Sequence, residues 1–143
     1  MIILEFVFSA ICTMSFGVLF NIPRKQLLYA AFVGASGWVI YSLLSKYSNS
    51  NVMAAFIGAL VVGGISEFLA RYRKMPATVF IIPGLIPLVP GYGLYYSMLK
   101  IVESDYLAAT EVGVETILVA IAISSAIIIT TSLSKKIKRK SIQ

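Results

Sequence analysis

The feature that most constrains this chain is a series of apolar runs, each about as long as a bilayer is thick. An α-helix rises about 1.5 Å per residue, so roughly 20 apolar residues cross the hydrocarbon core. The chain has 143 residues, of which 59% are hydrophobic and 13% charged. This composition predicts an all-α integral membrane protein rather than a soluble domain. It leaves no room for a separate catalytic domain outside the membrane.

Polar and basic residues divide the apolar sequence into five runs. We predict a bundle of about five transmembrane helices in a single transmembrane domain covering residues 1–143, with a Pro/Gly-broken fourth segment. The predicted segments are about 2–20, 27–44, 52–70, 77–99 and 113–134, followed by a basic tail at 135–143. The second run is rich in alanine and glycine, which allows neighbouring helices to approach closely. The alternative is four crossings, with one run lying at the membrane surface.

Positive charge is distributed unevenly between the loops. With five crossings, ten of the twelve Lys and Arg residues fall on one side, and only Lys46 and Lys100 fall on the other. Cytoplasmic loops retain an excess of Lys and Arg. We therefore expect the N-terminus outside and the C-terminus in the cytoplasm. Because the basic residues report orientation, they do not indicate a nucleic-acid ligand.

The fourth run differs from the others in its density of proline and glycine. Each proline removes a backbone donor and clashes with the preceding turn, so the segment should be kinked, unwound or re-entrant. Non-helical backbone at membrane depth is stable only where protein buries it or where it borders a water-filled cavity. We therefore predict a substrate pathway; the alternative is a kink that serves packing alone. The pathway candidates are Thr78, Pro83, Gly84, Pro87, Pro90, Gly91 and Tyr92.

Two helix ends carry further candidate residues. Glu67 precedes Arg71 by one turn, the spacing of neighbours on one helix face. An acid inside a membrane is a candidate for proton coupling, and the alternative is an ion pair with Arg71 at the interface. Asn21 and Pro23 end the first run. Asn21 either lines a vestibule or caps the helix.

The residue types that enzymes and metal sites need are scarce. The chain has no histidine and a single cysteine, Cys12, inside an apolar run. We find no metal-ligand cluster, no pair of nucleophile and base, and no nucleotide-binding loop. We therefore predict no catalytic residue, no metal and no cofactor, and we predict that the protein is not an enzyme.

Short motifs in three of the runs carry a family resemblance. The first run ends in Phe20-Asn21-Ile22-Pro23 before a basic residue, and Arg71 closes the third. The fourth contains Val79-Phe80 and then Ile86-Pro87-Leu88-Val89-Pro90-Gly91. This combination, spread over nearly the whole chain, resembles the threonine/serine exporter (ThrE) superfamily, and more narrowly its short-subunit type, called YjjB. Pro83-Gly84 departs from the shared motif as an additional breaker in front of it.

The resemblance implies one subunit of a secondary-active exporter of small hydrophilic metabolites, driven by the proton gradient. Its long members export threonine and serine, and its split pairs export dicarboxylates such as succinate. It implies a larger YjjP-type membrane subunit as partner, and a place in the bilayer of the bacterial cell (inner) membrane. A homo-oligomer is a further arrangement to consider, since five helices enclose little pathway. The alternative function is a non-transporting scaffold or assembly subunit.

Overall fold

The computed structural model describes the backbone of residues 1–48 and 50–140 and the side chains of residues 1–48 and 50–136. This part of the chain is helical and contains no strand, which confirms the predicted all-α class. The elements are α1 (Ile2–Leu19), α2 (Arg24–Tyr47), α3 (Asn51–Arg73), α4 (Thr78–Leu85), the 3₁₀ helix η1 (Ile86–Leu88), α5 (Gly91–Val102) and α6 (Tyr106–Lys140).

Four of these helices are long and apolar enough to cross a membrane. They are α1, α2, α3 and α6. The segment from α4 through η1 to α5 makes a fifth only if it is counted as one span, and it bends by 45° at its break. The number of crossings therefore stays a prediction.

Backbone geometry explains where α1 ends. Asn21 has a φ of 55°, in the left-handed region, and its N–H donates to the Val18 carbonyl at 3.0 Å. The next N–H, from Ile22, donates to the Gly17 carbonyl at 3.0 Å. This pair of bonds is the Schellman motif, which satisfies carbonyls at the end of a helix. Asn21 thus sits in a helix-capping position.

The centre of the bundle lies where α2, α3 and α4 meet. Val33, Val62 and Phe80, one from each helix, are fully buried. Glycines bring the outer helices close to this centre: a Cβ at Gly34 would overlap Thr13 of α1, and one at Gly63 would overlap Thr130 of α6. The small residues of the second run thus lie at close helix contacts, as their type predicts.

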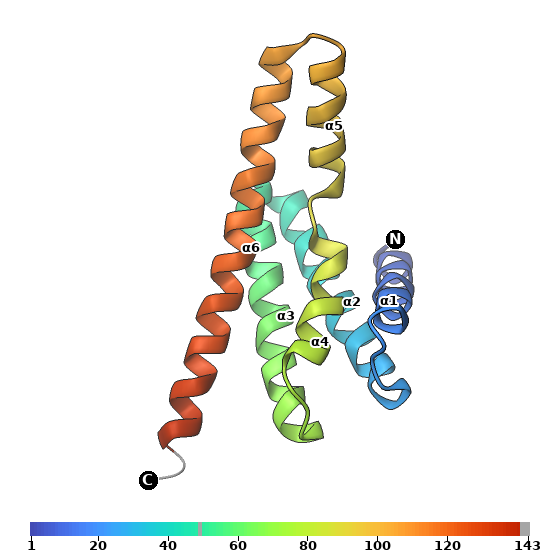
Figure 1. The fold of residues 1–143 in the computed structure, drawn as a ribbon, viewed down its shortest axis with the longest axis vertical. Helices are drawn as coiled ribbons and strands as arrows, with labels where there is room; N and C mark the ends of the chain where they lie inside the picture. Colours follow the sequence, from blue (N-terminus) through green and yellow to red (C-terminus); the bar gives the residue numbers. More distant parts are fainter. Residues whose placement is uncertain (49, 141–143) are drawn as a thin grey trace.

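The hairpin of α5 and α6 extends beyond the other helices at the top of Figure 1. With 35 residues, α6 is about 52 Å long, whereas a bilayer's hydrocarbon core is about 30 Å thick. The helix starts at Tyr106, directly after Asp105, which caps it. The Asp105 Oδ1 accepts a hydrogen bond from the Ala108 N–H at 3.2 Å. Glu111 and Glu115 therefore lie on α6.

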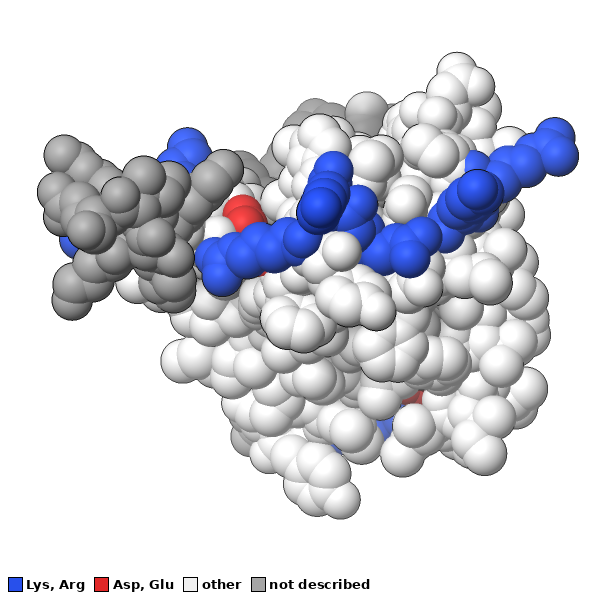
Figure 2. All heavy atoms as spheres, turned by 90° about the horizontal axis from the view of Figure 1, so that it is seen from below, with Lys and Arg blue, Asp and Glu red and all other residues white. Residues whose placement is uncertain are grey.

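Basic side chains gather at the opposite end of the molecule, where α1 and α3 end and α2 begins. Figure 2 shows Lys and Arg side chains in a row across this face. The described residues of this basic end are Arg24, Lys25, Arg71, Arg73, Lys74, Lys135 and Lys136. At the other end, Lys46 pairs with Glu5 at 2.9 Å.

Candidate functional site

The break between η1 and α5 has a defined backbone geometry. Pro90 has a φ of −76° and a ψ of 56°, and the Gly91 N–H donates to the Val89 carbonyl at 2.7 Å. These values are those of an inverse γ-turn. Val89 before it is extended, with a φ of −58° and a ψ of 126°. The helix therefore stops at Leu88 and begins again in a new direction at Gly91.

A cavity of about 610 Å³ borders this break. Its walls come from the middle and end of α2, the first residue of α3, the break itself, the start of α5 and one face of α6. The lining residues are Trp38, Tyr41, Asn51, Pro87, Leu88, Val89, Pro90, Gly91, Tyr92, Gly93, Tyr96, Val112, Glu115, Thr116 and Val119.

A chain of polar side chains crosses the wall formed by α2, α3 and α6. The Ser45 hydroxyl donates to the Asn51 Oδ1 at 2.8 Å, and the Asn51 amide donates to the Glu115 Oε1 at 2.8 Å. The amide thus orients the carboxylate of Glu115 while leaving its second oxygen for another donor. Among residues 1–48 and 50–140, no three His, Cys, Asp or Glu side chains gather as a metal site.

Aromatic side chains form the wall on α5. The rings of Tyr92 and Tyr96 stack with their centroids 5.6 Å apart. Lys100 lies over the Tyr96 ring at 5.4 Å and pairs with Glu103 at 2.7 Å. Glu115 is the ionisable acid among the described lining residues, and none of these is Lys or Arg.

The first turn of α5 also borders the cavity through Gly91, Tyr92 and Gly93. The first N–H groups of a helix have no partner within it, and the helix dipole is positive at this end. The cavity therefore combines a positive helix terminus on one wall with a carboxylate on another.

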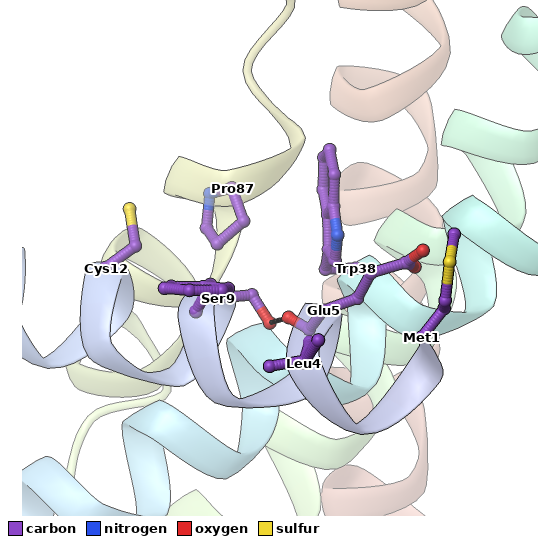
Figure 3. Close-up of a pocket in the computed structure, with 8 residues that line it drawn as sticks. Met1, Leu4, Glu5, Ser9, Cys12, Trp38 and Pro87 are labelled. Atoms are coloured by element: carbon purple, nitrogen blue, oxygen red, sulfur yellow. Dashed lines mark hydrogen bonds between the residues drawn. The ribbon is translucent and has the colours of Figure 1, made fainter.

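A second, more apolar cavity of about 430 Å³ lies on the α1 side. Figure 3 shows Glu5 and Cys12 extending from α1 toward the side where Trp38 and Pro87 lie. Trp38 and Pro87 line both cavities. These two side chains are therefore the wall that the cavities share.

The structure brings some of the predicted pathway residues together and leaves others apart. Pro87, Pro90, Gly91 and Tyr92 line the cavity at the break. Thr78, Pro83 and Gly84 do not line it. Thr78 is exposed at the start of α4, whereas Pro83 and Gly84 are buried inside that helix.

Packing explains the position of Gly84. A Cβ there would lie 3.0 Å from Val33 and 3.2 Å from Val62, so the glycine lets α4 approach α2 and α3 closely. The additional Pro83-Gly84 breaker thus belongs to the packed core of the bundle. The unwinding point is at Val89 and Pro90.

Glu67 and Arg71 lie near the basic end, away from the cavity. Among the described side chains the ion pairs are Glu5–Lys46 and Lys100–Glu103, so Glu67 and Arg71 are not joined directly. Instead, Ser134 of α6 donates to the Glu67 Oε2 at 2.5 Å and accepts from the Arg71 guanidinium at 2.6 Å. Both side chains reach toward α6, so a serine between them replaces the direct contact.

Sequence reasoning did not identify Trp38, Asn51, Glu115 and Thr116 as cavity residues. Trp38 is the chain's single tryptophan, and it lies amid small residues in the second run. That contrast was an available signal. Asn51 gave none, because an asparagine in a polar loop is ordinary. Asn21 and Pro23, between α1 and α2, do not line the cavity either.

Similarity to known proteins extends over most of the chain. Residues 5–133 match the model of a protein family described as Threonine/Serine exporter, ThrE. An uncharacterized protein of Haemophilus influenzae is 31% identical over 108 residues, which are 75% of this chain and 36% of that relative. The chain therefore spans about a third of that relative's length. No solved structure matches.

Proposed function

Because this chain belongs to the threonine/serine exporter family, we propose that it is a subunit of a secondary-active exporter of small hydrophilic metabolites. The chain is a multi-pass membrane protein of a transporter family. The substrate path includes the cavity at the helix break. The proposal rests on one observation. Glu115, the first turn of α5 and the unwound backbone all line the same cavity of about 610 Å³.

The charges of the cavity favour an amino acid over a dicarboxylate. The ammonium group of threonine or serine pairs with Glu115, and the carboxylate group lies at the N-terminus of α5, where N–H donors are available. Succinate carries two carboxylates, one of which would face Glu115 with no lysine or arginine among the described lining residues to offset it. Threonine and serine are therefore the proposed substrates, ahead of succinate.

A larger membrane subunit of the YjjP type completes the transporter in this proposal. The H. influenzae relative has about two thirds of its length outside the matched part, which supports a second half supplied by another chain. The transporter lies in the bacterial cell membrane in this proposal. Its basic end is in the cytoplasm and its N-terminus outside, following the positive-inside rule. In this orientation the cavity lies toward the outer half of the membrane.

Efflux from loaded cells tests the proposal. Cells lacking their own exporters are loaded with labelled threonine, serine or succinate, and they express this chain alone or with a YjjP-type partner. We expect threonine and serine efflux to require both chains. Pro90→Ala should reduce it, because an alanine restores a backbone donor and favours a continuous helix across the break.

Two matched acidic substitutions distinguish the cavity from general surface charge. Glu115 lines the cavity, whereas Glu111 is exposed one turn earlier on the same helix and does not line it. Glu115→Gln should lower threonine efflux strongly, and Glu111→Gln should leave it near the wild-type rate. Equal effects of the two substitutions would argue against a substrate contact at Glu115. Partner binding without efflux of any solute would favour the scaffold function.

A further inference from the structure

A groove of about 790 Å³ runs between α2 and α3 on a face separate from the cavity at the break. Its apolar lining comes from both helices. Leu28, Phe32 and Phe68 are 71%, 54% and 67% exposed, so large apolar side chains border the groove without a covering element in the described chain. The remaining lining residues are Lys25, Tyr29, Ile65, Leu69 and Arg73.

Two cations stand at one end of this groove. Lys25 lies in the first turn of α2, and Arg73 is the last residue of α3. Both therefore belong to the basic end shown in Figure 2. The acidic side chain nearest this end on α3, Glu67, is bonded to Ser134 of α6 and does not line the groove. The mouth of the groove is therefore positively charged.

Arg73 is held in place by contacts on α2. Its Nε–H donates to the Oε1 of Gln26 at 3.2 Å, and its guanidinium lies 4.6 Å from the centroid of the Tyr29 ring. Gln26 is only 7% exposed, so a buried side chain orients the arginine. The guanidinium keeps further N–H donors in a planar fork, a geometry that suits phosphate oxygens.

We propose that this groove binds an anionic phospholipid. The phosphate group lies between Lys25 and Arg73, and an acyl chain follows the apolar side chains of α2 and α3 toward the middle of the membrane. Charge complementarity selects this occupant, because basic pockets between membrane helices on the cytoplasmic side are suited to anionic headgroups. A neutral phospholipid has the same chains but no net negative charge for the two cations. If a helix of a partner protein filled the groove instead, Lys25 and Arg73 would need acidic residues on that helix to balance their charge.

Lipid binding to the full purified chain in detergent micelles tests the proposal, for example by native mass spectrometry. The probes are phosphatidylglycerol, phosphatidylcholine with the same acyl chains, and glycerol 3-phosphate. We expect phosphatidylglycerol to bind at least tenfold more tightly than phosphatidylcholine. Glycerol 3-phosphate should not compete at equal concentration, since it cannot fill the apolar part of the groove. Equal affinity for the two lipids, or competition by the soluble phosphate, would overturn the proposal.

Charge-neutralising variants locate the headgroup. Lys25→Gln and Arg73→Gln should each weaken phosphatidylglycerol binding by about fivefold, the effect expected for one basic residue near a headgroup. Arg24→Gln is the matched control, because Arg24 is exposed, adjacent in sequence and outside the groove. If Arg24→Gln weakens binding as much as Lys25→Gln, the attraction is diffuse and the discrete site is wrong. If a co-purified partner subunit abolishes the lipid preference, the groove is a protein interface and the proposal fails.

Discussion

Two adjacent glycines in α3 permit a sharp test of the helix packing. Gly63 and Gly64 are both inside the helix, so replacing either by alanine gains about the same helix propensity, roughly 1 kcal/mol. Their surroundings differ. A Cβ at Gly64 has nothing within 4 Å, whereas a Cβ at Gly63 would overlap the hydroxyl of Thr130 and lie 3.0 and 3.1 Å from that residue's Cβ and Cγ2.

The contacts at Gly63 determine the magnitude of the expected effect. Rotating the Thr130 hydroxyl away would break its hydrogen bonds to the carbonyls of Ala126 and Ile127, and the Cβ of Thr130 would still lie 3.0 Å from the new methyl group. The helices α3 and α6 must therefore separate, and overpacking of this kind costs about 1–3 kcal/mol. Gly64→Ala should leave stability unchanged or raise it. Gly63→Ala should be less stable than Gly64→Ala by about 1–3 kcal/mol.

Reversible unfolding of the purified protein in mixed micelles measures this difference. The double substitution Gly63→Ala with Thr130→Ala removes the hydroxyl and Cγ2 of Thr130 and leaves only the 3.0 Å contact with the Cβ at position 130, so it should recover part of the lost stability relative to Thr130→Ala alone. Equal stability of Gly63→Ala and Gly64→Ala would refute the close approach of α3 and α6 at this point.

Three further predictions follow from other contacts. Ser104 holds a φ of 62° after α5, so Ser104→Gly should raise the free energy of unfolding by about 1 kcal/mol, whereas Ser97→Gly inside α5 should lower it by about as much. Asn51→Ala removes the donor that orients Glu115, so the KM for threonine efflux should rise about two- to tenfold; an unchanged KM would mean that the orientation is unimportant. Glu67→Gln should abolish the dependence of efflux on an imposed pH gradient if Glu67 carries the coupling proton, and retained dependence would exclude that role.

The sequence predicted the helical class because the length of apolar runs and the charge of loops are properties of short segments. The Pro/Gly density also located a broken segment correctly, since proline acts on its own turn. It did not locate the break within the segment. Pro83 is buried inside α4 and Pro90 ends the helical path, and the difference depends on packing of Gly84 against α2 and α3. Such tertiary contacts have no signature in a single sequence.

The cavity residues illustrate the same limit. Asn51 and Glu115 are 64 positions apart and meet only because α3 starts beside the first third of α6. For Glu67 and Arg71, the helical spacing correctly placed both side chains on one face of α3. On that face each side chain contacts Ser134 of α6 rather than the other. Spacing within one helix was therefore informative about the shared face, and uninformative about the partner on that face.

Protection of an introduced cysteine tests the central claim that substrate occupies the cavity at the break. In a Cys12→Ser background, Tyr92→Cys places a thiol in the cavity lining, and Tyr95→Cys places one on the same helix outside it. Both positions are exposed, at 76% and 64% for the native side chains, so both thiols should react with a small alkylating reagent. The account predicts that threonine slows alkylation at position 92 and not at position 95. No protection at position 92, or equal protection at both positions, would contradict it.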